Sequence, residues 1–273
     1  MSLAFLTAAL YLSELECYRL RNLAKLPPFV NIILHLKQFH DTFRENYLIT
    51  LFDRENEMTK SEMTDYYAKR ASEYECVYQK PERQKNLKAL QTTLSESFRG
   101  LDVLEIACGT GYWTQFACRS AKSILATDYN EEVLAIAREK DYGDCPVKFV
   151  KADAYVLDEV NGMFSAALVG FWWSHIPKSK LDGFLQVLHS KLSRGATVIV
   201  MDNRYVVNSS TPISRTDDES NTYQIRQLSD GSNHEVLKNF SSRQDFIEKI
   251  TPLSKKCEFN ELEYFWIAEY NLN

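Results

Sequence analysis

The chain has 273 residues, of which 45% are hydrophobic and 25% are charged, and its formal net charge is -5. This composition is typical of a folded globular protein that is long enough to bury a sizeable core. The negative net charge gives no support to a nucleic-acid partner, because nucleic-acid binding requires a basic surface. The six cysteines are scattered and the five histidines show no metal-ligand spacing. Composition therefore predicts a reducing, cytoplasmic compartment and no metal site.

The first 62 residues are predicted to form a helical extension. Residues 1–12 are apolar, but they lack a basic flank, are too short to span a bilayer and precede no signal-cleavage pattern, so no membrane partner is predicted. Prolines at 27–28 break the segment, and residues 29–39 have the pattern of an amphipathic helix. Two interpretations stay open. The extension packs on the sheet or on a second subunit of a homodimer, or it lies outside a functional protein whose translation starts near Met63.

A short apolar run over residues 101–106 is followed by a glycine-rich turn that opens a helix. The run predicts a strand that is buried on both faces. Gly109 and Gly111 let the backbone approach a ligand without a Cβ in the way, and the following helix presents unpaired N–H groups. The turn therefore predicts a binding site for a nucleotide-sized ligand.

This turn lacks the features of two common nucleotide sites. A dinucleotide fingerprint needs a small residue three places after Gly111, where Thr114 stands, and a phosphate-cradling loop needs a lysine. Carboxylates at strand ends, such as that of Glu105, repel phosphate. They suit a ligand that carries an ammonium group, a sulfonium and a ribose diol, and S-adenosylmethionine fits that description.

Further strands follow at the spacing of a doubly wound sheet. Residues 123–128 form an apolar run that ends in Asp128, and a carboxylate at the end of such a strand can accept hydrogen bonds from both ribose hydroxyls. The alternation of strands and helices predicts an α/β fold with a mostly parallel sheet and helices on both faces. The remaining strands of this sheet are predicted at residues 147–150, 164–170, 197–201 and 263–272.

These features resemble the class I S-adenosylmethionine-dependent methyltransferases of the small-molecule type. The likeness rests on residues 105–111, Asp128, residues 153–154 and the strand over residues 164–171. It implies a Rossmann-like domain over residues 63–273 with S-adenosylmethionine as cofactor. Where the family often has an aspartate at the start of the fourth strand, this chain has a serine, which weakens the case for an acidic base there. The resemblance implies cofactor contacts from Tyr67, Arg70, Glu105, Ala107, Gly109, Gly111, Trp113, Asp128, Tyr129, Asp153, Ala154, Val169 and Gly170.

The resemblance extends to residues 66–74, an aromatic and basic segment. Many small-molecule methyltransferases open with a helix of this kind, which folds over the cofactor. This implies that Tyr67 and Arg70 contact the cofactor and that Tyr74 contacts the substrate. The alternative is a surface helix whose tyrosines pack against one another while Arg70 stays in solvent.

His175 follows the fourth predicted strand, at the edge where such sheets bind ligands. It is the predicted catalytic base, because the ordinary pKa of histidine suits proton transfer near neutral pH. The alternative is that it hydrogen-bonds the loop before Pro177. Trp172 and Trp173 either wall the acceptor pocket or belong to the core.

Residues 221–239 hold two strand-like runs on either side of an Asp-Gly pair, which predicts a hairpin over the open end of the sheet. The arginines around it predict an anionic acceptor, because the guanidinium fork matches carboxylate and phosphate geometry. The alternative is a solvated hairpin whose arginines pair with nearby carboxylates. The predicted acceptor-binding residues are Tyr74, Trp172, Trp173, Arg204, Tyr205, Arg215, Tyr223 and Arg226.

The sequence thus predicts a methyltransferase that moves a methyl group from S-adenosylmethionine to a small anionic metabolite by in-line displacement. Methylation of a protein side chain or terminus is a second interpretation and would need an exposed groove. A third is a regulatory module that binds the cofactor without transferring its methyl group.

Overall fold

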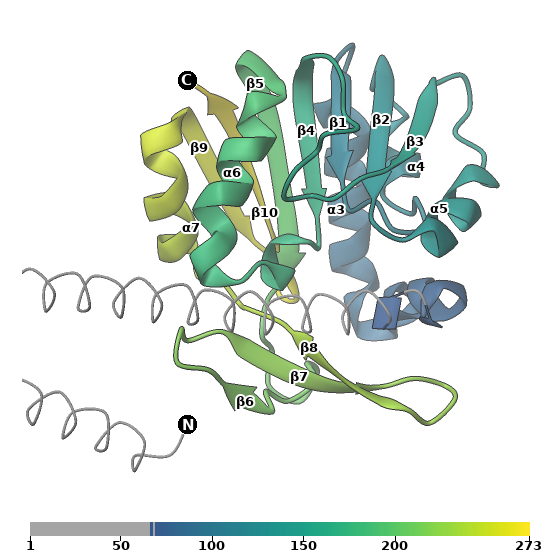
Figure 1. Ribbon diagram of the computed structural model, residues 1–273, viewed down its shortest axis with the longest axis vertical. Helices are drawn as coiled ribbons and strands as arrows, with labels where there is room; N and C mark the ends of the chain where they lie inside the picture. Colours follow the sequence, from purple (N-terminus) through teal and green to yellow (C-terminus); the bar gives the residue numbers. More distant parts are fainter. Residues whose placement is uncertain (1–65, 68) are drawn as a thin grey trace, which may run out of the picture. The chain divides into compact units, whose positions relative to one another are not determined.

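The computed structural model describes residues 66, 67 and 69–273 (Figure 1). The predicted extension over residues 1–62 lies outside the described residues. Within the described part of the chain, no helix is both long and apolar enough to cross a membrane.

A seven-stranded sheet forms the centre of the described chain, with the strand order β3-β2-β1-β4-β5-β10-β9. β1 to β5 are parallel, β10 is antiparallel to β5, and β9 is antiparallel to β10. The predicted mostly parallel, doubly wound sheet is confirmed. Its edge strand β9 is an addition to the prediction. The strands are β1 (Asp102–Ile106), β2 (Ser123–Asp128), β3 (Val147–Lys151), β4 (Phe164–Gly170), β5 (Leu192–Asn203), β9 (Ser254–Glu261) and β10 (Phe265–Leu272).

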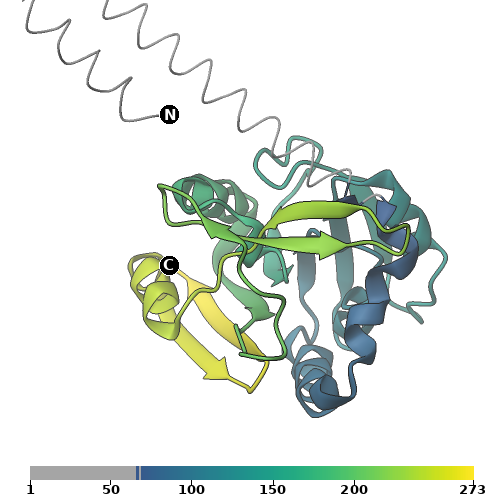
Figure 2. The same cartoon turned by 90° about the horizontal axis from the view of Figure 1, so that it is seen from below.

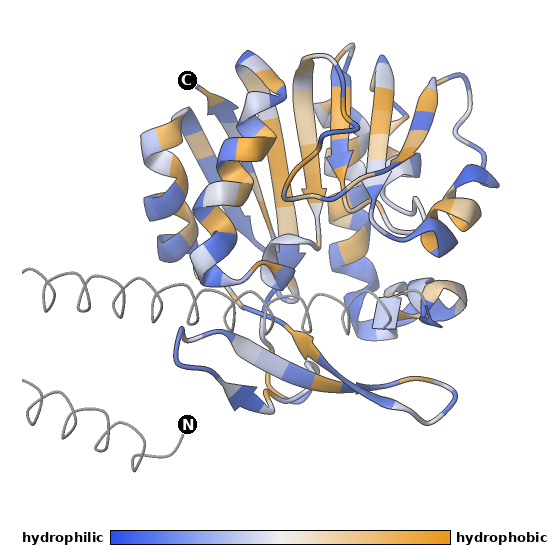
Figure 3. Ribbon diagram, viewed as in Figure 1, coloured by the Kyte–Doolittle hydropathy of each residue, from blue (hydrophilic) through white to orange (hydrophobic). Residues whose placement is uncertain are grey.

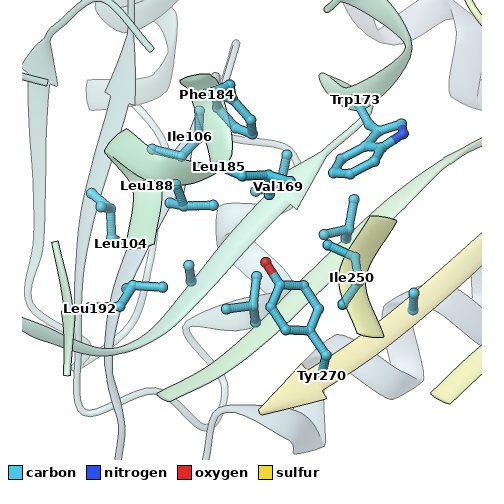
Figure 4. Packing of buried hydrophobic residues seen from close by; sticks show 14 of the residues in the cluster. Leu104, Ile106, Val169, Trp173, Phe184, Leu185, Leu188, Leu192, Ile250 and Tyr270 are labelled. Atoms are coloured by element: carbon cyan, nitrogen blue, oxygen red, sulfur yellow. The ribbon is translucent and has the colours of Figure 1, made fainter. Parts of the chain in front are cut away.

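Helices cover both faces of this sheet, because successive residues of the buried strands point to opposite sides. Leu104 and Val169 pack with Phe184 on one face (Figure 4), while Val103 and Leu168 belong to the core on the other face. Figure 3 shows the resulting pattern, with apolar residues along the central strands and polar residues on the outer sides of the helices. The first face carries α6 (Leu181–Ser190) and α7 (Arg243–Ile250), and the second carries α3 (Gln84–Ser97), α4 (Thr114–Ala117) and α5 (Glu131–Arg138).

A second, three-stranded antiparallel sheet consists of β6 (Arg215–Thr216), β7 (Thr222–Gln227) and β8 (Asn233–Leu237). The predicted hairpin is therefore present, with Gln227 paired to Asn233 beside the turn. Figures 1 and 2 show this sheet across the carboxyl ends of the parallel strands. Five 3-10 helices are found within the described residues: η1 (Ala71–Gln79), η2 (Pro81–Arg83), η3 (Trp173–His175), η4 (Lys178–Lys180) and η5 (Thr251–Leu253).

Candidate active site

The turn between β1 and α4 adopts backbone conformations that suit glycine. Gly109 and Gly111 have φ angles of 56° and 75°, in the left-handed region. A Cβ on Gly109 would lie 3.3 Å from the ring of Tyr74, which belongs to η1. The missing side chain therefore lets η1 pack directly over the turn.

A cavity of about 810 Å³, open to solvent at its mouth, lies at this turn, and we call it the glycine-turn cavity. It opens at the carboxyl ends of the parallel strands, where doubly wound sheets bind ligands. The structure brings eleven of the predicted site residues to its wall: Tyr67, Tyr74, Ala107, Gly109, Asp128, Tyr129, Asp153, Ala154, Gly170, Trp172 and His175.

Asp128 both holds the turn and faces this cavity. Its carboxylate accepts hydrogen bonds from the backbone N–H groups of Gly109 and Asn130, each at 2.9 Å. Burial raises the pKa of Asp128, and the backbone N–H donors act in the opposite direction. Across the cavity, the indole N–H of Trp172 is buried without a hydrogen-bond partner among the described residues. The cavity therefore offers a ligand both an acceptor and a donor.

Four of the predicted cofactor residues do not line this cavity: Gly111 lies in the turn itself, and Glu105, Trp113 and Val169 are buried behind it. Glu105 is buried and accepts a hydrogen bond of 2.7 Å from the Thr114 hydroxyl, and its burial raises its pKa to about 8. The indole of Trp113 donates to the Tyr78 hydroxyl at 2.9 Å. These residues support the turn from the core side.

A second cavity of about 820 Å³, also open at its mouth, adjoins the first, and we call it the basic cavity. None of the described residues that line it is an aspartate or a glutamate. The Nε atoms of Arg83 and Arg226 are buried and have no hydrogen-bond partner among the described residues. Arg83 Nε lies 4.0 Å from the Glu82 carboxylate, whereas no ion pair is found for Arg226 among the described residues. A lining of cations without a carboxylate favours an anion. The cationic residues of the lining are Arg70, Lys80, Arg83, Arg226 and Lys238.

Lys238 is the most deeply buried of these cations, with 3% of its surface exposed. Its ammonium donates to the Asp202 carboxylate at 3.0 Å and to the Ser174 hydroxyl. Burial lowers its pKa to about 8, although Asp202 favours the charged form. The charge of Lys238 therefore changes within reach of physiological pH.

Tyr67, Tyr74, Phe171 and His175 line both cavities and form the boundary between them. At this boundary the Tyr67 hydroxyl lies 2.9 Å from Nε2 of His175, whose Nδ1 lies 2.7 Å from the Leu237 carbonyl oxygen. Burial lowers the pKa of His175 well below its usual range, and the nearby cations act in the same direction. His175 is therefore a neutral imidazole that belongs to both sites.

Comparison with known proteins identifies a methyltransferase domain in this chain. A model of the family described as a methyltransferase domain matches residues 103–195. The demethylmenaquinone methyltransferase of Clavibacter sepedonicus is 33% identical over 91 residues, which cover 33% of this chain and 37% of that protein. This match spans well under half of that relative's length.

Two solved structures match more of the chain. A DhpI–SAH complex is 27% identical, with a TM-score of 0.63 over 79% of this chain and 97% of that one. A DhpI–SAM–HEP complex is 26% identical, with a TM-score of 0.64 over 78% and 97%. Residues 103–195 are therefore a methyltransferase domain, and the described chain has the fold of the S-adenosylmethionine-dependent methyltransferases.

The glycine-turn cavity suits the cofactor of this methyltransferase family, S-adenosylmethionine. Gly109 lines the cavity, the Asp128 carboxylate can accept hydrogen bonds from ribose hydroxyls, and the indole N–H of Trp172, another lining residue, has no hydrogen-bond partner among the described residues. Tyr129 and Asp153 complete the wall beyond the ends of β2 and β3. These residues would hold the cofactor with its methyl-bearing sulfonium available to an acceptor.

Three predicted acceptor residues of the methyltransferase lie away from both cavities. Trp173 is buried in the core, where its indole donates to the Ser241 hydroxyl at 3.0 Å. Arg204 donates to the Leu262 carbonyl at 2.6 Å, at the end of β5. Tyr205 is 41% exposed and packs on an aromatic neighbour. Of the two alternatives for Trp173, the structure therefore shows that it belongs to the core.

Two further predicted acceptor residues lie on the small sheet but outside the lining of the basic cavity. Arg215 is exposed, pairs with Glu235 at 2.7 Å and lies 3.6 Å from the centre of the Tyr223 ring. The Tyr223 hydroxyl donates to Asp217 at 2.9 Å. Arg215 therefore follows the alternative of an arginine balanced by a nearby carboxylate.

The structure adds lining residues that sequence reasoning missed. Gln224 of β7 lines the basic cavity two residues before Arg226, which the sequence did predict as an acceptor residue, and Lys238 just after β8 lines it as well. The spacing of two residues between Gln224 and Arg226 could have predicted that both side chains face the same side, because alternate residues of a strand share a face. Lys80 and Arg83, around the start of α3, carried no such signal.

Proposed function

We propose that this protein transfers the methyl group of S-adenosylmethionine to a small anionic acceptor bound in the basic cavity. The observation that carries the proposal is the group of five cations, Arg70, Lys80, Arg83, Arg226 and Lys238, that line a cavity whose described lining has no carboxylate. A carboxylate or phosphate-like group suits such a lining, because it accepts hydrogen bonds from guanidinium and ammonium groups.

The arrangement suits a reaction that depends on alignment. S-adenosylmethionine supplies a methyl group on a positively charged sulfur, so the protein has chiefly to orient the acceptor and exclude water. Tyr67, Tyr74 and Phe171 form an aromatic boundary between donor and acceptor cavities, and His175 lies in the same boundary. Methyl transfer across this boundary would occur away from bulk solvent.

A substrate search and one pair of variants test the proposal. Incubation with labelled S-adenosylmethionine and a metabolite extract is expected to label anionic compounds. Arg226→Gln is expected to lower kcat/KM for the acceptor by about tenfold or more, since hydrogen bonds to charged groups contribute about 1.5–3 kcal/mol. Cofactor affinity should stay nearly unchanged, because Arg226 lines the basic cavity and lies outside the lining of the other.

Arg215→Gln is the matched control. Arg215 lies on the neighbouring strand but is exposed and already paired with Glu235, so its substitution should leave acceptor kinetics unchanged. Equal losses in the two variants, or labelled products that are all neutral or cationic, would contradict the proposal.

A cytoplasmic location is also part of the proposal. It rests on cysteine usage, because the five cysteines within the described residues are free thiols, as expected in a reducing compartment. Cell fractionation would test it. The homodimer stays a prediction from the sequence, and light scattering would test that.

A further inference from the structure

His175 is locked in one orientation at the boundary of the two cavities. Its Nδ1 must donate to the Leu237 carbonyl at 2.7 Å, because a carbonyl oxygen only accepts. Nε2 therefore carries the lone pair and accepts the hydroxyl proton of Tyr67 at 2.9 Å. The imidazole thus presents a basic nitrogen to the boundary, with Tyr67 as its contact there.

The charged groups around this ring are positive. Burial is the largest cause that lowers the pKa of His175. The positive charges of Lys238, after β8, Arg226, in β7, and Arg70, beside η1, lower it further. The carboxylate of Asp202, at the end of β5, is engaged by Lys238 and the Ser174 hydroxyl. The two phenols of the boundary, on Tyr67 and Tyr74, are neutral, since burial raises both of their pKa values. Without an added negative charge, His175 is a weak base.

We propose that an anionic acceptor itself switches His175 on as the base, by offsetting the surrounding cations, and that Tyr67 relays the acceptor's proton to Nε2. This inference rests on the proposed function. The acceptor's nucleophilic atom gives its proton to the Tyr67 oxygen as the Tyr67 proton moves to Nε2 of His175. Its freed lone pair bonds to the methyl carbon while the C–S electron pair returns to sulfur. When the anionic product leaves, the cations again favour release of the imidazolium proton to water.

This arrangement selects acceptors by charge in the chemical step as well as in binding. A neutral molecule of the same shape would enter the cavity without activating His175. The base would then stay weak, because no added negative charge offsets the effect of Lys238 and Arg226 on the pKa of His175. Charge discrimination is therefore expected in kcat and not only in KM.

NMR titration of the histidines tests the proposal, with inorganic sulfate as the probe because its charge is constant over the pH range used. The His175 signal is assigned by its loss in His175→Gln. Saturating sulfate is expected to raise the pKa of His175 by about one unit, a tenfold gain in proton affinity. Sulfate that binds by calorimetry without this rise overturns the inference, whereas failure of sulfate to bind counts against the proposed anion site.

A second measurement needs no added anion. Arg226→Gln removes one cation and should raise the pKa of His175 in the free protein, while Arg215→Gln should leave it unchanged. An unchanged pKa in Arg226→Gln overturns the inference whether or not sulfate binds. Tyr67→Phe should keep the sulfate-induced rise yet lower kcat about 100-fold, the loss typical of a missing proton-transfer group. Full kcat in Tyr67→Phe would overturn the relay.

Discussion

At the scale of single residues, Asp128 has two tasks. Its carboxylate accepts from the backbone N–H of Gly109 and so fixes the glycine turn, and it also lines the glycine-turn cavity. Asp102, at the opposite end of the sheet, is a carboxylate of the same kind that pairs with exposed Lys122. Substituting each aspartate in turn therefore distinguishes a role of Asp128 in the site from the general effect of removing a negative charge.

Asp128→Ala is expected to weaken S-adenosylmethionine binding by about tenfold or more, because each charge-assisted hydrogen bond contributes about 1.5–3 kcal/mol. Asp102→Ala should leave the affinity within about twofold, since exposed ion pairs contribute little. Calorimetric titration with the cofactor measures both. Equal affinities in the two variants would remove Asp128 from the cofactor site.

Lys238 predicts a pH dependence for the binding of anions. Burial lowers its pKa to about 8, so its positive charge is present below that pH and is lost as the pH rises through it. Sulfate affinity should be constant up to about neutral pH and fall about tenfold by about pH 9, one unit above the pKa. Lys238→Arg should remove this fall, because arginine stays charged throughout. Calorimetry across the pH range is the measurement, and a flat wild-type profile would contradict the prediction.

At the scale of elements, η1 is held against the glycine turn. The Glu75 carboxylate accepts from the Thr110 hydroxyl at 2.7 Å and pairs with Lys140, and the Tyr74 ring lies over Gly109. This short helix therefore closes the glycine-turn cavity from outside the sheet. Its position depends on the close approach that Gly109 permits.

Gly109→Ala is expected to displace η1 and weaken cofactor binding, because the new Cβ would lie 3.3 Å from the Tyr74 ring. Gly100→Ala is the matched control. Gly100 also has a positive φ, so both variants incur backbone strain of about 1–2 kcal/mol, but no described atom lies within 4 Å of its Cβ. Thermal unfolding should show similar losses of stability, and calorimetry should show a loss of affinity in Gly109→Ala alone. A similar loss of affinity in both would argue that strain alone is responsible.

The hairpin is the element that brings Arg226 to the basic cavity. Its strands place Gln224 and Arg226 on the face that lines the basic cavity, while Ile225 between them is 54% exposed. Arg215 pairs in register with Tyr223, one residue out of phase with that face. One step in register therefore separates a lining arginine from a solvated one.

At the scale of the whole molecule, every strand of the central sheet lies between residues 102 and 272, and the first described residue, Tyr66, packs with Leu228 and Val236. A chain that begins at Met63 is therefore expected to fold and to bind S-adenosylmethionine. A chain that begins at Gln84 keeps all the strands but lacks η1, so it should lose cofactor affinity. Circular dichroism and calorimetry measure the two properties. Failure of the Met63 chain to fold would show that earlier residues belong to the core.

The sequence by itself determined the parallel strands of the central sheet and the position of the glycine turn at their carboxyl ends. The buried strand before Gly109 and the acidic end of the next strand are local patterns, and parallel strands necessarily bring such ends to one edge. The antiparallel β9 escaped prediction because its residues are mostly exposed and polar, as an edge strand allows. The local pattern of apolar and polar residues thus predicts which segments form buried strands.

Only the tertiary structure decided which cations meet in the basic cavity. Arg83 is the last residue of η2, Arg226 lies in β7 and Lys238 follows β8, and no spacing in the sequence relates these positions. Arg215 and Arg226 look alike in the sequence, yet one pairs with Glu235 and the other keeps a buried, unpartnered donor. The difference arises because strand register and long-range packing, which local patterns do not encode, determine where each side chain points.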